Sequence, residues 1–413
     1  MDVTISQGTL TGRVVIPPSK SVAHRLIIAA ALTNGTSVIK NVAYSKDIRA
    51  TINAMRALGA DIEENADSVA VKGIALSPDT CAIDCGESGS ALRFLVPICA
   101  QFGVNTAFYG HGKLPERPIT PYVDAMTVKG INFTQIPDGM FSISGKLTAG
   151  DYKIAPAVSS QFVTGLLFAL PMLDGDSRIL IDGRLESKPY VDITIDCLKQ
   201  FGIAVQETEY GYFVAGNQQY VPCDCTVEGD YSQAAFFCVA NALGSAVEIL
   251  GLQKKSAQGD MKILEICEEI VYNKNEGKNR LRAFTCDCSD TPDLVPILAV
   301  LASFCEGISE ITNVARLRIK ECDRLEAMTT CLNAVGGNVT AYPDRLVIVG
   351  VPALTGGTVD AFNDHRIPMA MAIAATRSLS PITITGAQCV DKSYPNFFDD
   401  LKALGANILF PNP

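Results

Sequence analysis

The chain has 413 residues, of which 48% are hydrophobic and 19% charged, which is enough apolar material for two or more domains with large buried cores. Its formal net charge of −10 argues against nucleic acids and acidic membranes as partners, because both favour a basic protein surface. No apolar run reaches the ~20 residues that a membrane helix needs, and the first residues lack the pattern of an export signal. We therefore expect a cytoplasmic protein.

The cysteines do not indicate a disulfide scaffold or a metal site. Fourteen of them are spread over the chain, and Cys-Asp-Cys triplets begin at Cys223 and Cys286. Without an export signal, reduced thiols are the expected state. The chain has three histidines, none at zinc-finger spacing from a pair of cysteines, so we predict no metal.

The first predicted helix, within PPSKSVAHRLIIAAAL (residues 17–32), places basic side chains in its opening turns. Acidic residues are more usual there, because a helix start already carries partial positive charge. Ser19 is the expected N-cap. Lys20, Ser21 and Arg25 cluster near the free N–H groups as the groups of an anion receptor would. The alternative is a solvated helix end.

A helical segment that ends in glycine and runs into an extended stretch recurs along the chain. Its glycines are Gly59, Gly130, Gly202, Gly336 and Gly405. The interval before Gly336 is nearly double the others, and the degenerate segment ILEICEEIVYNKNEG, ending at Gly277, fills it. A second glycine, expected after two strands and a tight turn, follows four of these segments, at Gly73, Gly145, Gly216 and Gly350. Six copies of one repeat therefore account for the whole chain.

Each repeat also contains a second helix, whose start carries polar residues. The six starts are PPSKSVAHR, CGESGSALR, AVSSQFVTG, EGDYSQAAF, SDTPDLVPI and FNDHRIPMA. All contain Ser, Asp or Asn as expected caps. Alternating strands and helices predict βαβαββ repeats with parallel sheet faces covered by helices. The polar helix starts are expected to converge on a shared site. The alternative is a linear solenoid of six repeats. Three repeats per domain give one domain of residues 1–18 and 229–413 and a second of residues 19–228.

Basic residues occur on or beside these helix starts and on polar loops. They are Lys20, Arg25, Arg93, Arg117, Lys188, Lys320, Arg324, His365, Arg366 and Lys392. Taken singly, each is most simply a solvated surface charge. As a set, they would neutralise a multiply charged anion through fork-like and point contacts. We therefore predict a phosphorylated ligand.

Nine short strings, in matching order across essentially the whole chain, carry a resemblance to a known family. They are PPSKSVAHR, GESGSALRFL, ERPI, SSQF, ESKPYVDIT, PDLVPILA, RIKECDRL, NDHR and DKSYPNFF. Together they resemble 5-enolpyruvylshikimate-3-phosphate synthase (3-phosphoshikimate 1-carboxyvinyltransferase), of the enolpyruvyl transferase family. The resemblance implies an α/β fold of two similar domains, each of three βαβαββ repeats with threefold pseudosymmetry (an inverse α/β barrel), closing over a cleft that holds the active site.

The same resemblance implies a reaction and its participants. The enolpyruvyl group of phosphoenolpyruvate would pass to the 5-hydroxyl of shikimate 3-phosphate, with release of phosphate, through a tetrahedral intermediate. This is a step of the shikimate pathway to aromatic amino acids. The resemblance implies small-molecule substrates, no cofactor, no nucleic-acid or membrane partner, and a monomer of the kind that glyphosate inhibits.

By position in these strings, the resemblance assigns three sets of site residues. Shikimate 3-phosphate would be held by Lys20, Ser21, Arg25, Ser159, Ser160, Gln161, Ser187, Tyr190, Asp293 and Lys320. Phosphoenolpyruvate would be held by Lys20, Gly89, Arg117, Gln161, Arg324, Arg366 and Lys392. The acid–base groups would be Asp293 and Glu321, with Lys20 as a further proton carrier. The simpler alternatives are a helix N-cap for Asp293 and an exposed ion pair with Lys320 or Arg324 for Glu321.

Five positions depart from the family's pattern, which leaves open the shape of the phosphoenolpyruvate pocket and the sensitivity to glyphosate. They are His24, Glu87, Ser90, Phe94 and Arg316. Two other functions remain open. One is a UDP-N-acetylglucosamine enolpyruvyl transferase, against which the sequence Lys20-Ser21 argues. The other is a catalytically silent anion-binding homologue, which would be expected to lose Asp293 or Glu321.

Overall fold

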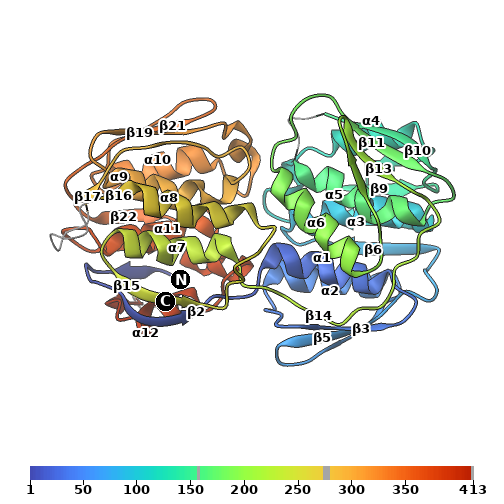
Figure 1. The fold of residues 1–413 in the computed structure, drawn as a ribbon, viewed down its shortest axis with the longest axis horizontal. Coiled ribbons are helices and arrows are strands. Elements are labelled where there is room, and N and C mark those ends of the chain that lie inside the picture. The colour runs from blue at the N-terminus through green and yellow to red at the C-terminus, as the bar shows by residue number, and fades with distance from the viewer. Residues whose placement is uncertain (156–158, 273–279, 411–413) are drawn as a thin grey trace. The chain divides into compact units, whose positions relative to one another are not determined.

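The chain folds into two compact units of mixed helices and strands (Figure 1). The computed structural model describes residues 1–155, 159–272 and 280–410. Unit 1 joins Met1–Pro17 to Gly229–Pro413, and unit 2 is Pro18–Glu228. The chain therefore leaves unit 1 after Pro17 and returns to it at Gly229.

Unit 2 contains three four-stranded sheets of one design. Its first repeat holds α1 (Lys20–Ala31), β3 (Thr36–Lys40), α2 (Lys46–Ala57), β4 (Asp61–Glu64) and β5 (Ser68–Lys72). The second holds β6 (Thr80–Asp84), α3 (Gly89–Phe102), β7 (Asn105–Tyr109), α4 (Thr120–Thr127), β8 (Asn132–Thr134) and β9 (Phe141–Ser144). The third holds β10 (Gly150–Ile154), α5 (Ser160–Ala169), β11 (Ser177–Ile181), α6 (Lys188–Gln200), β12 (Gln206–Thr208) and β13 (Gly211–Val214), and β14 (Cys225–Thr226) follows. The strand orders are β14-β3-β5-β4, β6-β7-β9-β8 and β10-β11-β13-β12.

Unit 1 repeats this design with one irregular member. Its irregular repeat holds β2 (Thr11–Val15), α7 (Tyr231–Ala242), β15 (Ala246–Leu250), α8 (Lys262–Ile270), β16 (Val271–Tyr272) and β17 (Arg280–Leu281). The next holds β18 (Thr285–Asp287), α9 (Val295–Ser303), β19 (Ile308–Thr312), α10 (Arg324–Ala334), β20 (Val339–Ala341) and β21 (Leu346–Val349). The last holds β22 (Gly357–Asp360), α11 (Arg366–Ala375), β23 (Ile382–Thr385), α12 (Phe397–Ala403), β24 (Ile408–Leu409) and β1 (Val3–Ile5). The irregular repeat forms two-stranded pairs, β15-β2 and β16-β17.

Three strands reach their sheets from far along the chain. β1 pairs antiparallel with β23 and β24, β2 pairs in parallel with β15, and β14 pairs in parallel with β3. In each four-stranded sheet the first pair of strands is parallel and the other pairs are antiparallel. The expected parallel sheet faces are therefore wrong in part, because only the first pair of strands in each four-stranded sheet is parallel.

The helices α3 and α9 are buried on nearly all sides, whereas α2 is amphipathic. Every residue of α9 is buried, and α3 is buried from Gly89 to Ala100 except at Ser90. In unit 2, α3 packs against α5, and in unit 1, α7, α9 and α11 pack against one another. The sheets lie outside these helices (Figure 1). The polar starts of the buried helices are thus held close together within each unit.

Four of the six polar helix starts are capped as the sequence predicts. The caps are Ser19, Ser88, Ser159 and Asp230, whose side chains accept backbone N–H groups of α1, α3, α5 and α7. The other two differ. α9 follows the 3₁₀ turn η5 (Pro292–Leu294), and before α11 Oδ1 of Asp364 accepts the N–H of Arg366 at 2.9 Å. Residues 157–158 of the third start lie outside the described residues.

The glycine that ends each helical segment has a positive φ wherever the structure describes it. The angles are 104° at Gly59, 89° at Gly130, 78° at Gly202, 89° at Gly336 and 96° at Gly405. Only glycine adopts this conformation at low cost, which is why it recurs at these helix ends. The degenerate sixth position, Gly277, lies outside the described residues.

The described ranges contain no helix long and apolar enough to cross a membrane. In the same ranges, no group of three or more His, Cys, Asp and Glu side chains is placed to hold a metal ion. All fourteen cysteines are described, and all are free.

Gly350, after β21, is the second glycine of its repeat, and its backbone lies close to the backbone of Cys305 and Gly307. Its N–H donates to the carbonyl oxygen of Gly307 at 2.9 Å, and a Cβ there would overlap the carbonyl oxygen of Cys305. We expect Gly350→Ala to lower the free energy of unfolding by ~1–3 kcal/mol. Gly8→Ala is the matched control, because a Cβ there meets no atom within 4 Å. Urea unfolding that gave equal stabilities for the two variants would contradict this reading.

Candidate active site

Lys20 begins α1 and is held by an acidic partner. Its Nζ lies 2.9 Å from Oδ2 of Asp47, and the two side chains are 18% and 14% exposed. Asp47 stands in the first turn of α2, after the N-cap Ser45. In the sequence it is an ordinary acidic residue at a helix start, and no local signal links it to Lys20. The pair fixes the ammonium group at the start of α1.

Arg25, also on α1, is buried among neutral oxygens. Its Nε donates to Oγ1 of Thr194 at 2.7 Å. Its Nη1 donates to the backbone oxygen of Ser21 at 2.7 Å, and its Nη2 to that of Tyr190 at 2.9 Å. Burial lowers the pKa of Arg25 to about 10. A cation in such surroundings would be stabilised by an anion that reached it.

The serines assigned to shikimate 3-phosphate by resemblance include three at helix starts. Ser159 is the N-cap of α5, and Ser160 is the buried first residue of that helix. Ser187, before α6, has φ 57° and ψ 34°, a left-handed conformation that is uncommon for residues other than glycine. Strain of this kind is often found at functional sites. The neighbouring Lys188 pairs with Asp192 at 2.7 Å.

A second group of polar side chains meets at the start of α3. Oε1 of Gln161 accepts from Nη1 of Arg93 at 2.7 Å, and Nε2 of Gln161 donates to Oγ of Ser90 at 2.9 Å. Gly89 is the first residue of α3. A Cβ on it would lie 2.9 Å from Nη1 of Arg117 and 3.4 Å from Oε1 of Gln161. The structure brings Gly89, Arg117 and Gln161 together, and it adds Arg93, which the assigned set omits.

In unit 1, Arg324 is enclosed by three carboxylates. Its Nε donates to Oδ2 of Asp364 at 2.7 Å. Its Nη1 donates to Oδ1 of Asp293 at 3.0 Å, and its Nη2 to Oε2 of Glu321 at 2.8 Å. Burial alone would lower the pKa of Arg324, but these carboxylates hold it well above its usual value. Arg324 is therefore a permanent cation inside this unit.

Asp293 lies between two arginines. Its Oδ2 accepts from Nη2 of Arg366 at 2.7 Å, while its Oδ1 accepts from Arg324. Burial alone would raise its pKa, but Arg366, Arg324 and Lys320 hold it well below its usual range. Asp293 stands inside η5, whose N-cap position is Thr291, so the N-cap interpretation of Asp293 is wrong.

Three more assigned residues lie in unit 1. Burial lowers the pKa of Lys320 to about 8, against the opposing charge of Asp293. Glu321 does pair with Arg324, but its side chain is only 16% exposed, so an exposed surface pair is the wrong description. Lys392 is buried and donates to the backbone oxygen of Asn363 at 2.6 Å. Glu321 and Asp293 thus both contact Arg324, and Lys320 lies close enough to all three to interact with their charges.

Asp364 is the residue of unit 1 that sequence reasoning missed. It is fully buried, and it accepts both the side chain of Arg324 and the backbone N–H of Arg366. In the string NDHR, an acidic residue just before a helix indicates a cap. Asp364 stands one residue before the N-cap position, His365, and accepts the N–H of Arg366. Its second partner lies 40 residues away in the chain, so no local pattern could reveal it.

Two of the departures from the family's pattern touch each other and affect Arg25. The rings of His24 and Phe94 meet edge to face with centroids 6.5 Å apart, and the guanidinium of Arg25 lies 5.0 Å from the ring centre of Phe94. Nδ1 of His24 lies 2.7 Å from Oγ1 of Thr51. Burial, with Lys20 and Arg25 nearby, holds the pKa of His24 well below its usual value. His24 is therefore neutral.

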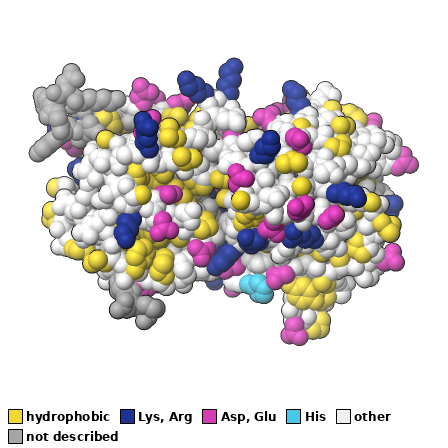
Figure 2. Space-filling model, turned by 90° about the horizontal axis from the view of Figure 1, so that it is seen from below, with side chains coloured by type: hydrophobic (Ala, Val, Ile, Leu, Met, Phe, Trp, Pro, Cys, Tyr) yellow, Lys and Arg dark blue, Asp and Glu magenta, His cyan; other side chains and the backbone are white. Residues whose placement is uncertain are grey.

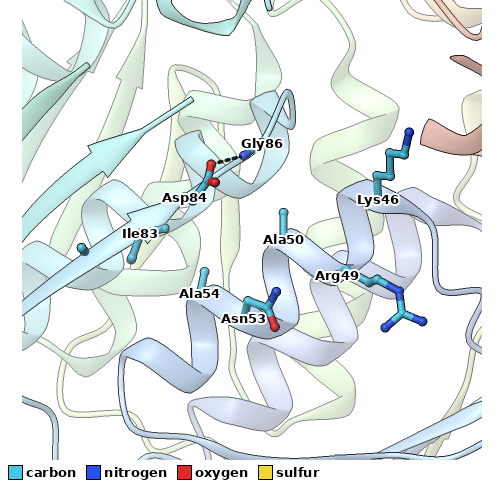
Figure 3. Close-up of a pocket in the computed structure, with 9 residues that line it drawn as sticks. Lys46, Arg49, Ala50, Asn53, Ala54, Ile83, Asp84 and Gly86 are labelled. Atoms are coloured by element: carbon cyan, nitrogen blue, oxygen red, sulfur yellow. Dashed lines mark hydrogen bonds between the residues drawn. The ribbon is translucent and has the colours of Figure 1, made fainter. Parts of the chain in front are cut away.

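The face of the molecule in Figure 2 carries charges of both signs. On the face that Figure 2 shows, Lys and Arg side chains stand among Asp and Glu side chains. A pocket of about 450 Å³ lies in unit 2 between α2 and the end of β6 (Figure 3). Lys46, Arg49 and Asn53 line it on the α2 side, and Asp84 and Gly86 on the other. The assigned residues instead lie mostly buried at helix starts and in the adjoining turns.

The fold defines the class as an α/β protein of βαβαββ repeats, and buried cations at helix starts are typical of proteins that bind anions. The family model described as EPSP synthase (3-phosphoshikimate 1-carboxyvinyltransferase) matches residues 5–401. The chain therefore belongs to the EPSP synthase family.

Individual relatives agree over nearly the full length. A protein of Clostridium kluyveri named 3-phosphoshikimate 1-carboxyvinyltransferase is 46% identical, covering 98% of this chain and 98% of its own. A protein of Clostridium botulinum with the same name is also 46% identical, covering 98% and 97%. A solved EPSP synthase from Acinetobacter baumannii has a TM-score of 0.81 at 24% identity, covering 99% of this chain and all of that one. These matches confirm the fold class and family predicted from the sequence.

Two glycine variants distinguish two effects of an added methyl group. Gly89→Ala tests whether the methyl group blocks the space for a ligand, and Gly86→Ala tests backbone strain. Gly89 has no positive φ, and its added methyl would abut Arg117. We expect Gly89→Ala to raise the Michaelis constant for phosphoenolpyruvate severalfold and to leave the melting temperature near that of the wild type. Gly86 has φ 58° and open space around a Cβ, so Gly86→Ala should cost about 1 kcal/mol of stability without affecting ligand.

Steady-state kinetics and thermal unfolding of both variants measure the two effects. We also expect glyphosate, which is bulkier, to lose more affinity than phosphoenolpyruvate in Gly89→Ala. A large loss of stability in that variant, with an unchanged ratio of the inhibition constant to the Michaelis constant, would show that the loop is misinterpreted.

Proposed function

We propose that the chain transfers the enolpyruvyl group of phosphoenolpyruvate to the 5-hydroxyl of shikimate 3-phosphate and releases inorganic phosphate. The name of its relatives, 3-phosphoshikimate 1-carboxyvinyltransferase, supports this reaction. The observation that carries it is the carboxylate of Asp293 between Arg324 and Arg366, in contact with both. This cluster combines a candidate proton-transfer group with two cations suited to an anionic substrate.

Shikimate 3-phosphate is proposed to bind chiefly through unit 2. Its proposed ligands there are Lys20, Ser21, Arg25, Ser159, Ser160, Gln161, Ser187 and Tyr190. Arg25 supports this assignment, because it is a buried cation whose hydrogen-bond partners are neutral oxygens. Asp293 and Lys320 are the proposed contributions of unit 1. The proposal therefore requires that residues of both units act on one pair of substrates.

Phosphoenolpyruvate is proposed to bind through cations of both units. Its proposed ligands are Lys20, Gly89, Arg117, Gln161, Arg324, Arg366 and Lys392. The absent side chain of Gly89 leaves the space beside Arg117 and Gln161 open. Guanidinium groups suit this ligand because each presents paired N–H donors to a carboxylate or phosphate.

The proposed chemistry is an addition followed by an elimination. In the addition, the 5-hydroxyl loses its proton to a base, its oxygen bonds to C2 of phosphoenolpyruvate, and C3 gains a proton to become a methyl group. In the elimination, C3 loses a proton, the C2–O bond to phosphate breaks, and the enol ether forms. Asp293, Glu321 and Lys20 are the proposed proton carriers for these steps. All three are held by charged partners that fix their positions.

An assay of phosphate release separates this function from the alternatives. Purified protein with phosphoenolpyruvate should release phosphate when shikimate 3-phosphate is added, and not when UDP-N-acetylglucosamine is added. The family match does not favour the UDP-N-acetylglucosamine enzyme. If neither acceptor causes phosphate release, the protein is a catalytically silent anion-binding homologue. A monomeric state and a cytoplasmic location are part of the same proposal, and gel filtration with light scattering tests the first.

Lys20→Ala should remove most of the activity without unfolding the protein. The lysine lies at a helix start, where its ammonium group serves the ligand and the reaction, and not the apolar core. We expect kcat to fall by about a hundredfold or more, as for other groups that stabilise charge in a transition state. Lys72→Ala, at an exposed position of β5, is the matched control and should retain wild-type turnover. Normal turnover of Lys20→Ala with a normal melting curve would refute the assigned site.

The lowered pKa of Lys320 predicts that shikimate 3-phosphate binds more weakly above about pH 8. Burial lowers its pKa to about 8, so the ammonium group loses its proton and its attraction for phosphate as the pH rises through this value. We expect the Michaelis constant for shikimate 3-phosphate to rise by at most about tenfold per pH unit above this point. The variant Lys320→Met should lack this inflection.

Deprotonation of Lys320 should not lower the free energy of unfolding over the same pH range. The pKa of this residue is lowered from 10.5 to about 8 on folding, so between these values the unfolded chain binds more protons there. The contribution of Lys320 to the free energy of unfolding therefore rises with pH. A Michaelis constant that does not change between pH 7 and 9 in the wild type would contradict the binding role.

A further inference from the structure

The three carboxylates around Arg324 bind two different parts of its guanidinium group. Asp364 lies along one edge, where its Oδ2 accepts from Nε at 2.7 Å and its Oδ1 lies 3.4 Å from Nη2. Asp293 and Glu321 accept from Nη1 and Nη2 at 3.0 and 2.8 Å. One positive charge is thus shared among three negative ones.

The three carboxylates also differ in burial. The side chain of Asp364 is 0% exposed, and it is tied to the start of α11 through the N–H of Arg366. The side chains of Asp293 and Glu321 are 19% and 16% exposed. Asp293 and Glu321 are therefore partly exposed to solvent, whereas Asp364 and the side chain of Arg324, which is 2% exposed, are enclosed.

We propose that the carboxylate of phosphoenolpyruvate displaces Asp293 and Glu321 from Arg324 and thereby releases both proposed proton-transfer groups from that arginine. Asp364 keeps its bond to Nε during this exchange and holds the arginine in place. The inference rests on the proposed function, which assigns Arg324 to phosphoenolpyruvate. A carboxylate has two coplanar oxygens that match a pair of guanidinium N–H donors, so it can take the place of the two oxygens that leave. Arg366 offers it a second cation.

The exchange changes Asp293 from a very weak base into a useful one. Burial alone would raise the pKa of Asp293, but Arg366, Arg324 and Lys320 hold it well below its usual range, with Glu321 acting against them. Loss of a guanidinium contact and arrival of a second negative charge both raise the pKa of a carboxylate. A base is more effective when its pKa lies closer to the working pH. Asp293 would then accept the 5-hydroxyl proton only once phosphoenolpyruvate is in place.

Proton uptake on binding tests this exchange without turnover. Calorimetric titration of the full chain with phosphoenolpyruvate at pH 5, in two buffers of different ionisation enthalpy, gives the number of protons taken up. We expect the wild type to take up more protons than Asp293→Asn, and Glu321→Gln to show a smaller deficit. Vinyl phosphate is the matched ligand, because it keeps the enol phosphate and lacks the carboxylate. It should cause less uptake than phosphoenolpyruvate in the wild type.

Equal uptake by the wild type and Asp293→Asn would overturn the exchange, as would equal uptake of protons with the two ligands. The comparison of ligands uses only the wild type, so it decides the question even where a variant fails to fold. The proposed function fails by a different observation, which is the absence of phosphate release when shikimate 3-phosphate is added to the same protein. Turnover without uptake dependent on Asp293 would leave the function standing and reject the exchange.

Discussion

The carboxylate of Asp364, buried between Arg324 and the first N–H of α11, is the contact on which half of the site depends. It joins α10 to α11 and sets the direction of the arginine that meets Asp293 and Glu321. Removing one partner of a buried ion pair typically costs ~3–5 kcal/mol, because the other charge stays buried and uncompensated. The positions of Asp293 and Glu321, the proposed proton-transfer groups of unit 1, therefore depend on a residue that has no assigned part in the chemistry.

The two units stabilise buried cations in different ways. In unit 1, Arg324 is met by carboxylates of the same unit, so an incoming anion has to exchange with them. In unit 2, Arg25 donates to hydroxyl and carbonyl oxygens and lies over the ring of Phe94. An anion that reached Arg25 would add to these contacts without displacing a charge. The same architecture thus provides two kinds of buried cation. At Arg324 an anion would replace bound carboxylates, and at Arg25 it would join the existing contacts.

The departures from the family's pattern show how a buried helix start tolerates change. His24 is neutral and is held by Thr51 and Phe94, so its ring adds no charge beside Lys20 and Arg25. Phe94 in turn packs against the guanidinium of Arg25. The two unusual residues form one packed pair, and their combined effect falls on the position of Arg25.

The sequence by itself determined the repeats, most of the helix caps and the identity of the family. Helix ends depend on local backbone chemistry, so Ser19, Ser88, Ser159 and Asp230 could be assigned as caps from a few neighbouring letters. The nine strings likewise determined the assigned site residues, because each lies within a short motif.

Only the tertiary structure decided which partner each charge has and which strands complete which sheets. Asp47 with Lys20 and Asp364 with Arg324 are pairs between different helices, and the carboxylate of Asp293 faces two arginines from α10 and α11. The pairings of β1, β2 and β14 join segments that lie far apart along the chain. Periodicity and capping act over a few residues, whereas these contacts exist only after packing has brought distant segments together. The same packing buries Lys320, which lowers its pKa, and places Asp293 beside Arg366 and Arg324, which hold its pKa below the usual range despite burial.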